Sequence, residues 1–459
     1  MEKRLTRIKA IILSIVILFT VLTFSIGLIG LIESEKKERG VNSADEYYMA
    51  ELNTFYEKGW SYDGESFNLK VKLDNNGRGQ FRLKYYDGDK EVLELYLNST
   101  SEISVELEKG DQAGVHTGRD MSNVSQYSAS KISIDNALGL RLFSAFASCG
   151  YIPIPCKKVV NYGWPLQTQD RATIELCEST ARVNGLNCIL KNDITISSFM
   201  GIGGMHGAYS GQFDGNQNTI NIGSFASRTY TSNAQSFALF AHVEGATIYD
   251  LILNFGTTNV NVNSIGLAGG MIGFAGDYGA TVKNCMVTGK FNITSSSNGG
   301  IFGGVVGQAN GNIVIENCAV KVNINTTEFM VATARSTHVG GIVGVQYYGQ
   351  CKIINSYYRG EMILNHYPEY EDTIGGLLGN CKTDLGTPSC YFYGNVIYFT
   401  KLHISMKANG CSYNILSNVT ANSGSGNNYY YIEQNTGNHD LSKNTYSAEM
   451  DAEMAKGWR

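Results

Sequence analysis

Length, composition and charge narrow the class of protein. The chain has 459 residues, enough for two or three domains, and its net charge of −5 gives no basis for nucleic-acid binding. Charged residues make up only 17% of the sequence, and 52 glycines against 5 prolines fit an extracellular β-rich repeat protein better than a cytosolic enzyme.

The N-terminal region carries a membrane-targeting pattern. Residues 1–9 are basic, and residues 10–32 are uncharged and almost wholly apolar. At ~1.5 Å per residue this run can cross a ~30 Å bilayer core as a helix. The basic flank then stays cytoplasmic, so we predict a single-pass signal anchor in the cell membrane with an extracellular C-terminal part. A cleaved signal peptide, which would give a secreted protein, and a pilin-like filament subunit are the alternatives.

A small α+β domain is predicted for residues 43–115. Residues 43–58 have the pattern of a helix, because Ser43 and Glu46 form a capping box. The following strands alternate apolar and polar residues with turn sequences between them, which indicates an antiparallel meander. Residues 116–164 carry mixed signals and are predicted to be a linker whose apolar end packs on the next domain. The four predicted strands are 67–73, 81–85, 93–97 and 103–107.

The second half of the chain repeats itself. A glycine-bracketed apolar run begins at Gly269, Gly303, Gly340 and Gly375, at spacings of 34, 37 and 35 residues. A fixed period in this range is typical of stacked repeats, and the units are rich in Val, Ile and Tyr with Gly and Asn at their ends. We therefore predict a parallel β-helix with about three strands per coil over residues 165–459. Matching residues should stack, in one ladder of Asn284, Asn317 and Asn355 and a second of Cys285, Cys318 and Ser356.

Both ends of the β-helix need a cover, because open terminal strands template aggregation. We predict a capping helix over residues 168–182 at the N-terminal end. A short amphipathic helix over residues 447–458 is predicted for the C-terminal end, and Tyr429–Tyr431 for one late strand.

The repeats resemble a known family. The run Gly-Gly-apolar-apolar-Gly followed by Ile/Val-x-Asn-Cys, and the coil at residues 211–220 (GQFDGNQNTI), are similar to the GLUG-motif repeats of bacterial cell-surface proteins. Such repeats also occur beside the catalytic domains of immunoglobulin-A-cleaving zinc proteases. The resemblance covers roughly residues 165–457 and implies a right-handed parallel β-helix with an adhesin-like role. It does not bring protease chemistry, because the sequence contains no His-Glu-x-x-His motif.

Catalytic groups are sparse in the repeats. Glycoside hydrolysis needs two carboxylates roughly 5–10 Å apart, but Asp277, Glu316 and Glu328 fall at different phases of the repeat. The histidines are dispersed, and no Cys/His spacing resembles a zinc site. We therefore predict that the protein is not an enzyme and needs no metal or cofactor. An exported carbohydrate-active β-helix enzyme, a polysaccharide lyase or a glycosidase, is the alternative.

The ten cysteines are predicted to be mostly buried thiols, which behave as small apolar side chains. Three pairs are close enough in sequence for a local disulfide instead. These pairs are Cys149/Cys156, Cys177/Cys188 and Cys381/Cys390.

A tyrosine-rich surface is the predicted ligand site. Tyrosine offers a ring that stacks on sugars and a hydroxyl that forms hydrogen bonds. In each adjacent pair one tyrosine should face inward, and we take Tyr348 and Tyr358 as the outward members. The insert at residues 366–372 is the most charged and aromatic loop of the repeats. The predicted contacts to a glycan or a surface protein are Tyr347, Tyr348, Tyr357, Tyr358, Tyr367, Glu369 and Tyr370.

Overall fold

A computed structural model gives the structure of this chain. It describes residues 55–62, 65–75, 80–99, 127–149, 151–161, 172–182, 185–204, 207–231, 234–262, 265–295, 300–329, 337–366, 372–381, 389–406, 411–414, 426–437 and 447–449. The predicted membrane anchor lies outside these residues. Within them, no helix is both long and apolar enough to span a membrane. Of the two compact units into which the chain divides, the larger comprises residues 54–100, 122–156 and 177–459.

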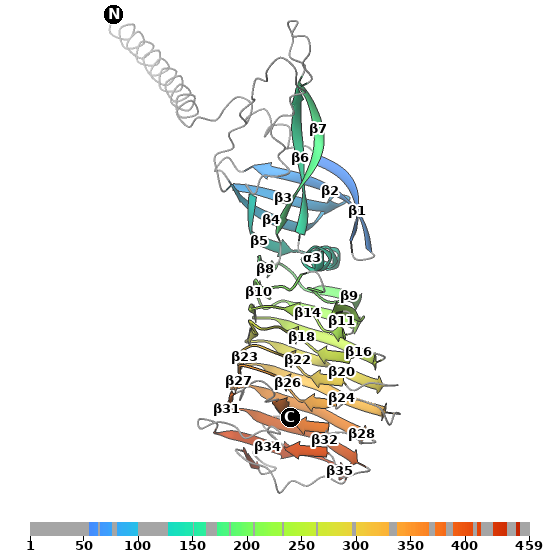
Figure 1. Cartoon of the computed structure of the whole chain (residues 1–459), viewed down its shortest axis with the longest axis vertical. Helices are drawn as coiled ribbons and strands as arrows, with labels where there is room; N and C mark the ends of the chain where they lie inside the picture. Colours follow the sequence, from blue (N-terminus) through green and yellow to red (C-terminus); the bar gives the residue numbers. More distant parts are fainter. Residues whose placement is uncertain are drawn as a thin grey trace, which may run out of the picture. The chain divides into compact units, whose positions relative to one another are not determined.

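The larger unit is dominated by a parallel β-solenoid, which confirms the predicted β-helix (Figure 1). Each complete coil contributes four strands, one to each of four sheets, and five coils are complete within the described residues. In the second of them the strands are β17 (Ile265–Gly269), β18 (Ile272–Ala275), β19 (Ala280–Lys283) and β20 (Met286–Ser295). The expected three strands become four, because the glycine-bracketed run makes a corner between two short strands.

The other complete coils have the same order of strands. The first contains β13 (Ala234–Phe237), β14 (Phe240–Val243), β15 (Ala246–Tyr249) and β16 (Ile252–Val262). The third contains β21 (Gly300–Gly303), β22 (Val306–Ala309), β23 (Ile313–Glu316) and β24 (Ala319–Phe329). The fourth contains β25 (His338–Gly340), β26 (Val343–Gln346), β27 (Gln350–Ile354) and β28 (Tyr357–His366). The fifth contains β29 (Asp372–Gly375), β30 (Leu378–Cys381), β31 (Ser389–Tyr393) and β32 (Val396–Met406).

Partial coils extend the solenoid at both ends. Before the first complete coil come β8 (Asn187–Leu190), β9 (Ile194–Phe199), β10 (Gln212–Asp214), β11 (Thr219–Phe225) and β12 (Arg228–Thr231). After the fifth come β33 (Cys411–Asn414), β34 (Asn428–Ile432), β35 (Asn435–Gly437) and β36 (Ser447–Glu449). The late strand predicted at Tyr429–Tyr431 is confirmed by β34. The helix predicted over residues 447–458 is wrong at its start, where β36 pairs in parallel with β34.

The glycine pair at the first corner of the second to fifth complete coils lets successive coils approach closely. A Cβ at Gly303 would lie 2.0 Å from the carbonyl oxygen of Val306, and one at Gly304 would lie 2.2 Å from that of Gly341. Neither distance is compatible with a side chain. The repeated Gly-Gly is therefore a steric requirement of the stacking.

A polar ladder follows the corner between the third and fourth strands, as the spacing predicted. Asp250, Asn284, Asn317 and Asn355 adopt φ of 52°, 52°, 53° and 47°, a left-handed conformation that Asn and Asp tolerate best after glycine. Nδ2 of Asn284 donates to Oδ1 of Asp250 at 3.0 Å. Nδ2 of Asn317 donates to Oδ1 of Asn284 at 3.3 Å. One residue type thus supplies both the corner geometry and the bond to the next coil.

The residues that follow this ladder are buried. Cys285, Cys318 and Ser356 stack inside the solenoid, as predicted. All six cysteines whose side chains are described are buried free thiols: Cys188, Cys285, Cys318, Cys351, Cys381 and Cys390. The sulfur atoms of Cys381 and Cys390 approach to 3.1 Å.

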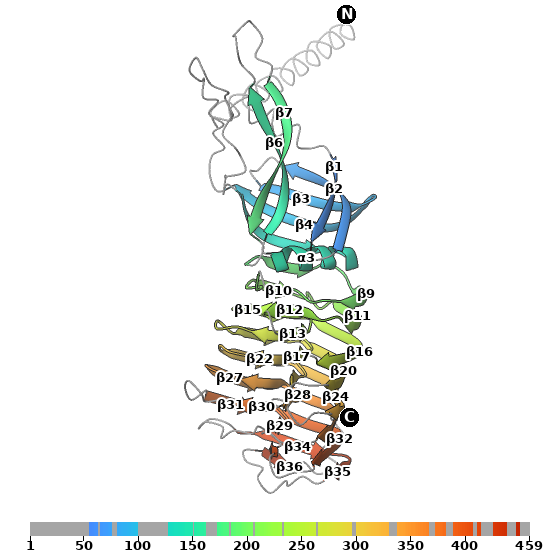
Figure 2. The ribbon, with the colours of Figure 1, turned by 45° about the vertical axis from the view of Figure 1, so that its right-hand side comes forward.

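An antiparallel meander precedes the solenoid. It consists of β1 (Phe55–Tyr62), β2 (Glu65–Asn75), β3 (Gln80–Asp87), β4 (Lys90–Ser99) and β5 (Tyr127–Ile134). β5 pairs in parallel with β8, so the meander and one wall of the solenoid form a continuous 12-stranded sheet (Figure 2). The predicted helix is wrong over residues 55–58, because β1 pairs along its whole length with β2. The predicted strand at 103–107 lies outside the described residues.

The predicted linker is structured where it is described. Residues 127–149 and 151–161 contain β5, helix α3 (Ala137–Cys149) and β6 (Tyr151–Asn161). Asn136 caps α3 by accepting a hydrogen bond from the Gly139 amide at 3.0 Å. The capping helix predicted over 168–182 is wrong, since strand β7 (Ala172–Arg182) is found there and pairs with β6.

Helix α3 covers the partial coil that precedes the first complete coil, so it takes the capping place that the sequence pattern assigned to residues 168–182. Phe143 packs edge-on against Tyr209 of the solenoid, with ring centroids 5.8 Å apart. Phe146 packs against Tyr85 of the meander, with ring centroids 6.0 Å apart. The apolar end of the predicted linker therefore does pack on the next part of the chain, but as a helix.

A network of charges ties the meander to the first turn of the solenoid. The Lys191 ammonium, between β8 and β9, lies 3.2 Å from Glu91, 3.2 Å from Glu94 and 3.4 Å from Asp135. Burial raises the pKa of Asp135. Burial acts in the same direction on Glu94, but the Lys191 charge and the hydrogen bond from Tyr96 outweigh it and hold the pKa of Glu94 below its usual value.

Candidate functional site

The turns between the second and third strands of successive coils form a groove. Residues 276–279, 310–312 and 347–349 make this turn in the second, third and fourth complete coils. The groove has a volume of about 560 Å³. We call it the corner groove; its lining residues are Asp277, Asn310, Gly311, Asn312, Tyr348 and Gly349.

Backbone hydrogen bonds hold the walls of the corner groove in place. The amides of Tyr347 and Tyr348 donate to the carbonyls of Ala309 and Asn310, at 2.8 Å and 3.1 Å. Gly349 has a φ of 71°, and a Cβ there would lie 2.7 Å from Oδ1 of Asn312. That oxygen also accepts a hydrogen bond from the Gln350 amide at 2.8 Å. The groove is therefore preorganised by the stacking of the coils.

The side chains of the corner groove combine an aromatic face with amide and carboxylate groups. Tyr348 is half-buried, and its ring tilts against that of Tyr347 with centroids 6.1 Å apart. Asp277 and Asn312 are exposed, and the neighbouring Tyr278 is 81% exposed. An aromatic ring flanked by carbonyl, amide and carboxylate groups can stack on a sugar ring and hydrogen-bond its hydroxyls.

The structure separates the tyrosines that the sequence grouped together. Tyr348 lines the corner groove, whereas Tyr347 packs against the buried cluster that contains Leu267 and Val345. Tyr357 begins the fourth strand of the same coil, so the whole of β27 lies between Tyr357 and the groove. The predicted contacts Tyr367, Glu369 and Tyr370 lie outside the described residues.

Tyr358 is not the outward member of its pair, so the predicted ligand contact at this residue is wrong. Its side chain is 0% exposed, and its hydroxyl donates to the carbonyl of Val322 at 3.1 Å. Burial raises its pKa above the ordinary value. Tyr357 is the half-buried outward neighbour, and burial raises the pKa of Tyr357 to about 12. The prediction that adjacent tyrosines of β28 face opposite sides was correct, but the inward and outward members were exchanged.

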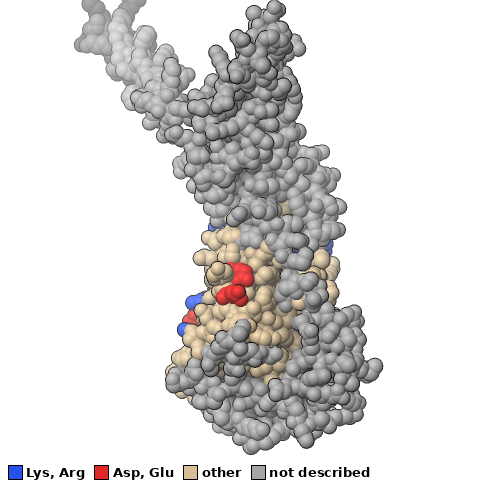
Figure 3. Space-filling model, viewed as in Figure 1, with Lys and Arg blue, Asp and Glu red and all other residues tan. Residues whose placement is uncertain are grey.

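Charge is scarce over the described face of the solenoid. Figure 3 shows a mostly uncharged surface with a small group of acidic side chains near its middle and a few charged side chains at its edges. Among the described residues, no three or more His, Cys, Asp and Glu gather where they could hold a metal ion. The polar character of the corner groove therefore comes mainly from the amides of Asn310 and Asn312, the Tyr348 hydroxyl and Asp277.

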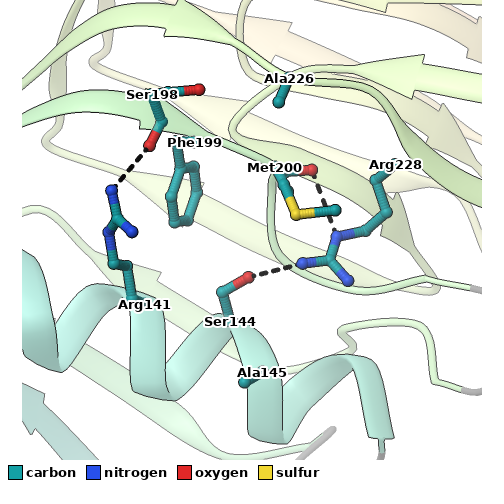
Figure 4. Close-up of a pocket in the computed structure, with 8 residues that line it drawn as sticks. All are labelled: Arg141, Ser144, Ala145, Ser198, Phe199, Met200, Ala226 and Arg228. Carbon is teal, nitrogen blue, oxygen red and sulfur yellow. Dashed lines mark hydrogen bonds between the residues drawn. The ribbon is translucent and has the colours of Figure 1, made fainter. Parts of the chain in front are cut away.

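A second cavity lies between α3 and the first strands of the solenoid (Figure 4). It has a volume of about 220 Å³. We call it the arginine cavity; its lining residues are Arg141, Ser144, Ala145, Ser198, Phe199, Met200, Ala226 and Arg228. No sequence pattern indicated this cavity, because Ser144 and Arg228 are 84 positions apart and meet only through the fold.

Comparisons with known proteins leave the family open. No family model matches the sequence, and no curated protein matches it. Among solved structures, the chain is similar to one named IgA1 Protease, with 11% sequence identity and a TM-score of 0.41. The match covers 88% of this chain and 28% of that one, so this chain spans well under half of that protein. A likeness at this level carries no argument about function.

Proposed function

We propose that this chain is a β-solenoid exposed at the cell surface, where it serves adhesion by binding a glycan in the corner groove. The observation that carries the proposal is the groove itself, in which Asp277, Asn312 and Tyr348 from three successive coils line one preorganised hollow. Parallel strands stack at ~4.8 Å, so three coils present a row of groups suited to an extended ligand.

The chemistry of the corner groove favours a neutral or amine-bearing glycan. Tyr348 supplies a stacking face, and the two asparagine side chains can each donate to and accept from sugar hydroxyls. Among the described residues that line the groove, Asp277 is the one that carries a charge, and its carboxylate would repel an acidic sugar. The ligand is bound and not cleaved in this proposal.

Attachment to the cell follows from the N-terminal sequence. The apolar run at residues 10–32 tethers the chain to the membrane in this proposal, with the solenoid outside and secretion as the alternative. The similarity of the repeats to GLUG-motif repeats of bacterial cell-surface proteins supports the same role.

The test is a glycan array probed with the full-length chain in nanodiscs, followed by titration of the best ligand. Tyr348→Ala should weaken its affinity roughly fivefold, because stacking on one aromatic ring contributes about 1 kcal/mol. The matched control is Tyr357→Ala, which removes a half-buried tyrosine of the same coil outside the groove and should leave affinity unchanged.

Two results would count against the proposal. One is an array on which no glycan binds the folded chain. The other is a ligand whose affinity responds to Tyr357→Ala and not to Tyr348→Ala. Recovery of the titrated glycan in cleaved form would support the alternative of a carbohydrate-active enzyme.

A further inference from the structure

Two buried thiols of the fifth coil lie close enough to react with each other. Cys381 ends β30 and Cys390 lies in β31, and the two residues are 5% and 1% exposed. Their sulfur atoms are 3.1 Å apart. Eight residues separate the two cysteines along the chain, so a bond between them would close a short loop at the corner between the two strands.

Other thiols of the solenoid stand at matching positions of successive coils. Cys351 of the fourth coil is in register with Cys390, and Cys285 and Cys318 follow the polar ladder of the second and third coils. Sγ of Cys285 donates to the carbonyl of Lys283 at 3.1 Å, and Sγ of Cys318 donates to that of Glu316 at 3.3 Å. A bond between coils would also close a loop of more than thirty residues, at a higher entropic cost than the short loop. The short loop of the fifth coil is therefore the favoured place for a cross-link.

The folded environment indicates when this cross-link forms. The hydrogen bond with Cys390 and burial raise the pKa of Cys381, so Cys381 is a thiol at neutral pH. Exchange with a disulfide needs a thiolate that the oxidant can reach. The reaction therefore belongs to folding, before β30 and β31 are covered, and burial afterwards protects the product from reductants.

We propose that Cys381 and Cys390 form a disulfide as the chain folds, with a small disulfide such as oxidised glutathione as the oxidant. One cysteine thiolate attacks the oxidant and releases the first glutathione, and the other cysteine displaces the second glutathione from the mixed disulfide. The two cysteines together lose two electrons and two protons. The oxidised glutathione takes up both and leaves as two reduced molecules.

The disulfide lies beside the corner groove. The amide of Ser389, the neighbour of Cys390, donates to the carbonyl of Gly349 at 3.1 Å, and Gly349 lines the groove. The cross-link thus fixes the coil against which the last turn of the groove rests. Exported proteins meet such oxidants, whereas the cytosol keeps thiols reduced. The setting rests on the export in the proposed function, but the pairing of the two cysteines depends only on the fold.

The test is oxidative refolding of the full-length chain, followed by peptide mapping. The chain is unfolded in urea with a reductant and refolded in detergent with oxidised and reduced glutathione, and the remaining thiols are blocked before digestion. Trypsin cuts after lysine and arginine, so it places Cys351, Cys381 and Cys390 on three separate peptides. The expected product joins the peptides 360–382 and 383–401 and disappears on reduction.

Variants separate this disulfide from a cross-link elsewhere. Cys381→Ala and Cys390→Ala should each abolish the linked peptides. Cys351→Ala, the matched loss of a buried thiol from the coil before, should keep them. Oxidation should raise the melting temperature by at least about 2 °C more in the wild type than in Cys381→Ala, because a cross-link restricts the unfolded chain. Circular dichroism confirms that each variant folds.

Three outcomes would overturn the inference. The first is recovery of Cys381 and Cys390 as blocked free thiols from the folded wild type. The second is a preferred cross-link between coils, such as Cys351 to Cys390. The third is a yield of the linked peptides no higher than that from the chain oxidised in urea. None of them bears on glycan binding in the corner groove, so the two proposals are tested independently.

Discussion

Replacing Val343 by aspartate is expected to lower the free energy of unfolding by about 3 kcal/mol or more. Val343 is fully buried in β26, in register between Val306 of the coil before and Leu378 of the coil after. A carboxylate there would be a buried charge without a partner. Because each coil is stabilised by its neighbours, the loss should extend into the third and fifth coils.

The control for Val343→Asp is Ile363→Asp in the same coil. Ile363 is half-buried and points outward from β28, so an aspartate there remains solvated and should cost under about 1 kcal/mol. Urea unfolding of the full-length chain, followed by circular dichroism, gives both values. If the two variants unfold alike, the inward and outward faces assigned to this coil are wrong.

Replacing Lys191 by methionine is expected to lower the free energy of unfolding by about 2 kcal/mol. The substitution leaves the Glu94 carboxylate, whose side chain is 4% exposed, beside Glu91 and Asp135, with Lys84 at 3.7 Å and the hydrogen bond from the Tyr96 hydroxyl at 3.0 Å as remaining compensation. Breaking a fully buried ion pair costs about 3–5 kcal/mol, and the 35% exposure of the Lys191 side chain reduces that figure. The control is Lys283→Met, whose partner Glu316 is a third exposed, with an expected cost under about 1 kcal/mol.

The pH dependence of the Lys191 effect has a defined sign. The pKa of Glu94 is lowered in the folded state, so its stabilisation is present above the ordinary value of 4.5 and is lost as pH falls through the folded pKa. The three carboxylates raise the pKa of Lys191 despite burial, so its stabilisation is lost only at strongly alkaline pH. The difference between wild type and Lys191→Met should therefore be largest near neutral pH and shrink below about pH 4. A difference that stays constant into acid would rule out a charge effect.

The repeat pattern predicted the solenoid and its ladders because those features depend on identical local rules in every coil. Asn284, Asn317 and Asn355 recur where the backbone needs a residue that tolerates the left-handed conformation, and the sequence alone shows this recurrence. The number of strands per coil could not be predicted from the sequence, because a corner made of two glycines leaves no break in an apolar run. The phase of Tyr357 and Tyr358 was likewise open, since alternation alone does not say which face is inside.

The parts that sequence reasoning missed depend on contacts between distant segments. Residues 55–58 fit a helical pattern, yet pairing with β2 decides their conformation. Helix α3 covers the partial coil at the N-terminal end of the solenoid because Phe143 meets Tyr209, 66 positions away. The arginine cavity needs α3, β9 and β12 together. In the corner groove only Tyr348 was predicted, because Asp277 and Asn312 reach it through the stacking of coils.

Hydrogen–deuterium exchange with and without the best-binding glycan tests glycan binding in the corner groove most directly. The full-length chain in nanodiscs should show slower exchange in the turns at residues 276–279, 310–312 and 347–349 when the glycan is bound, with the fourth strands of the same coils unchanged. Tyr348→Ala should reduce that protection at equal glycan concentration. Protection confined to any other part of the chain, or no protection in these three turns at saturating glycan, would contradict the account.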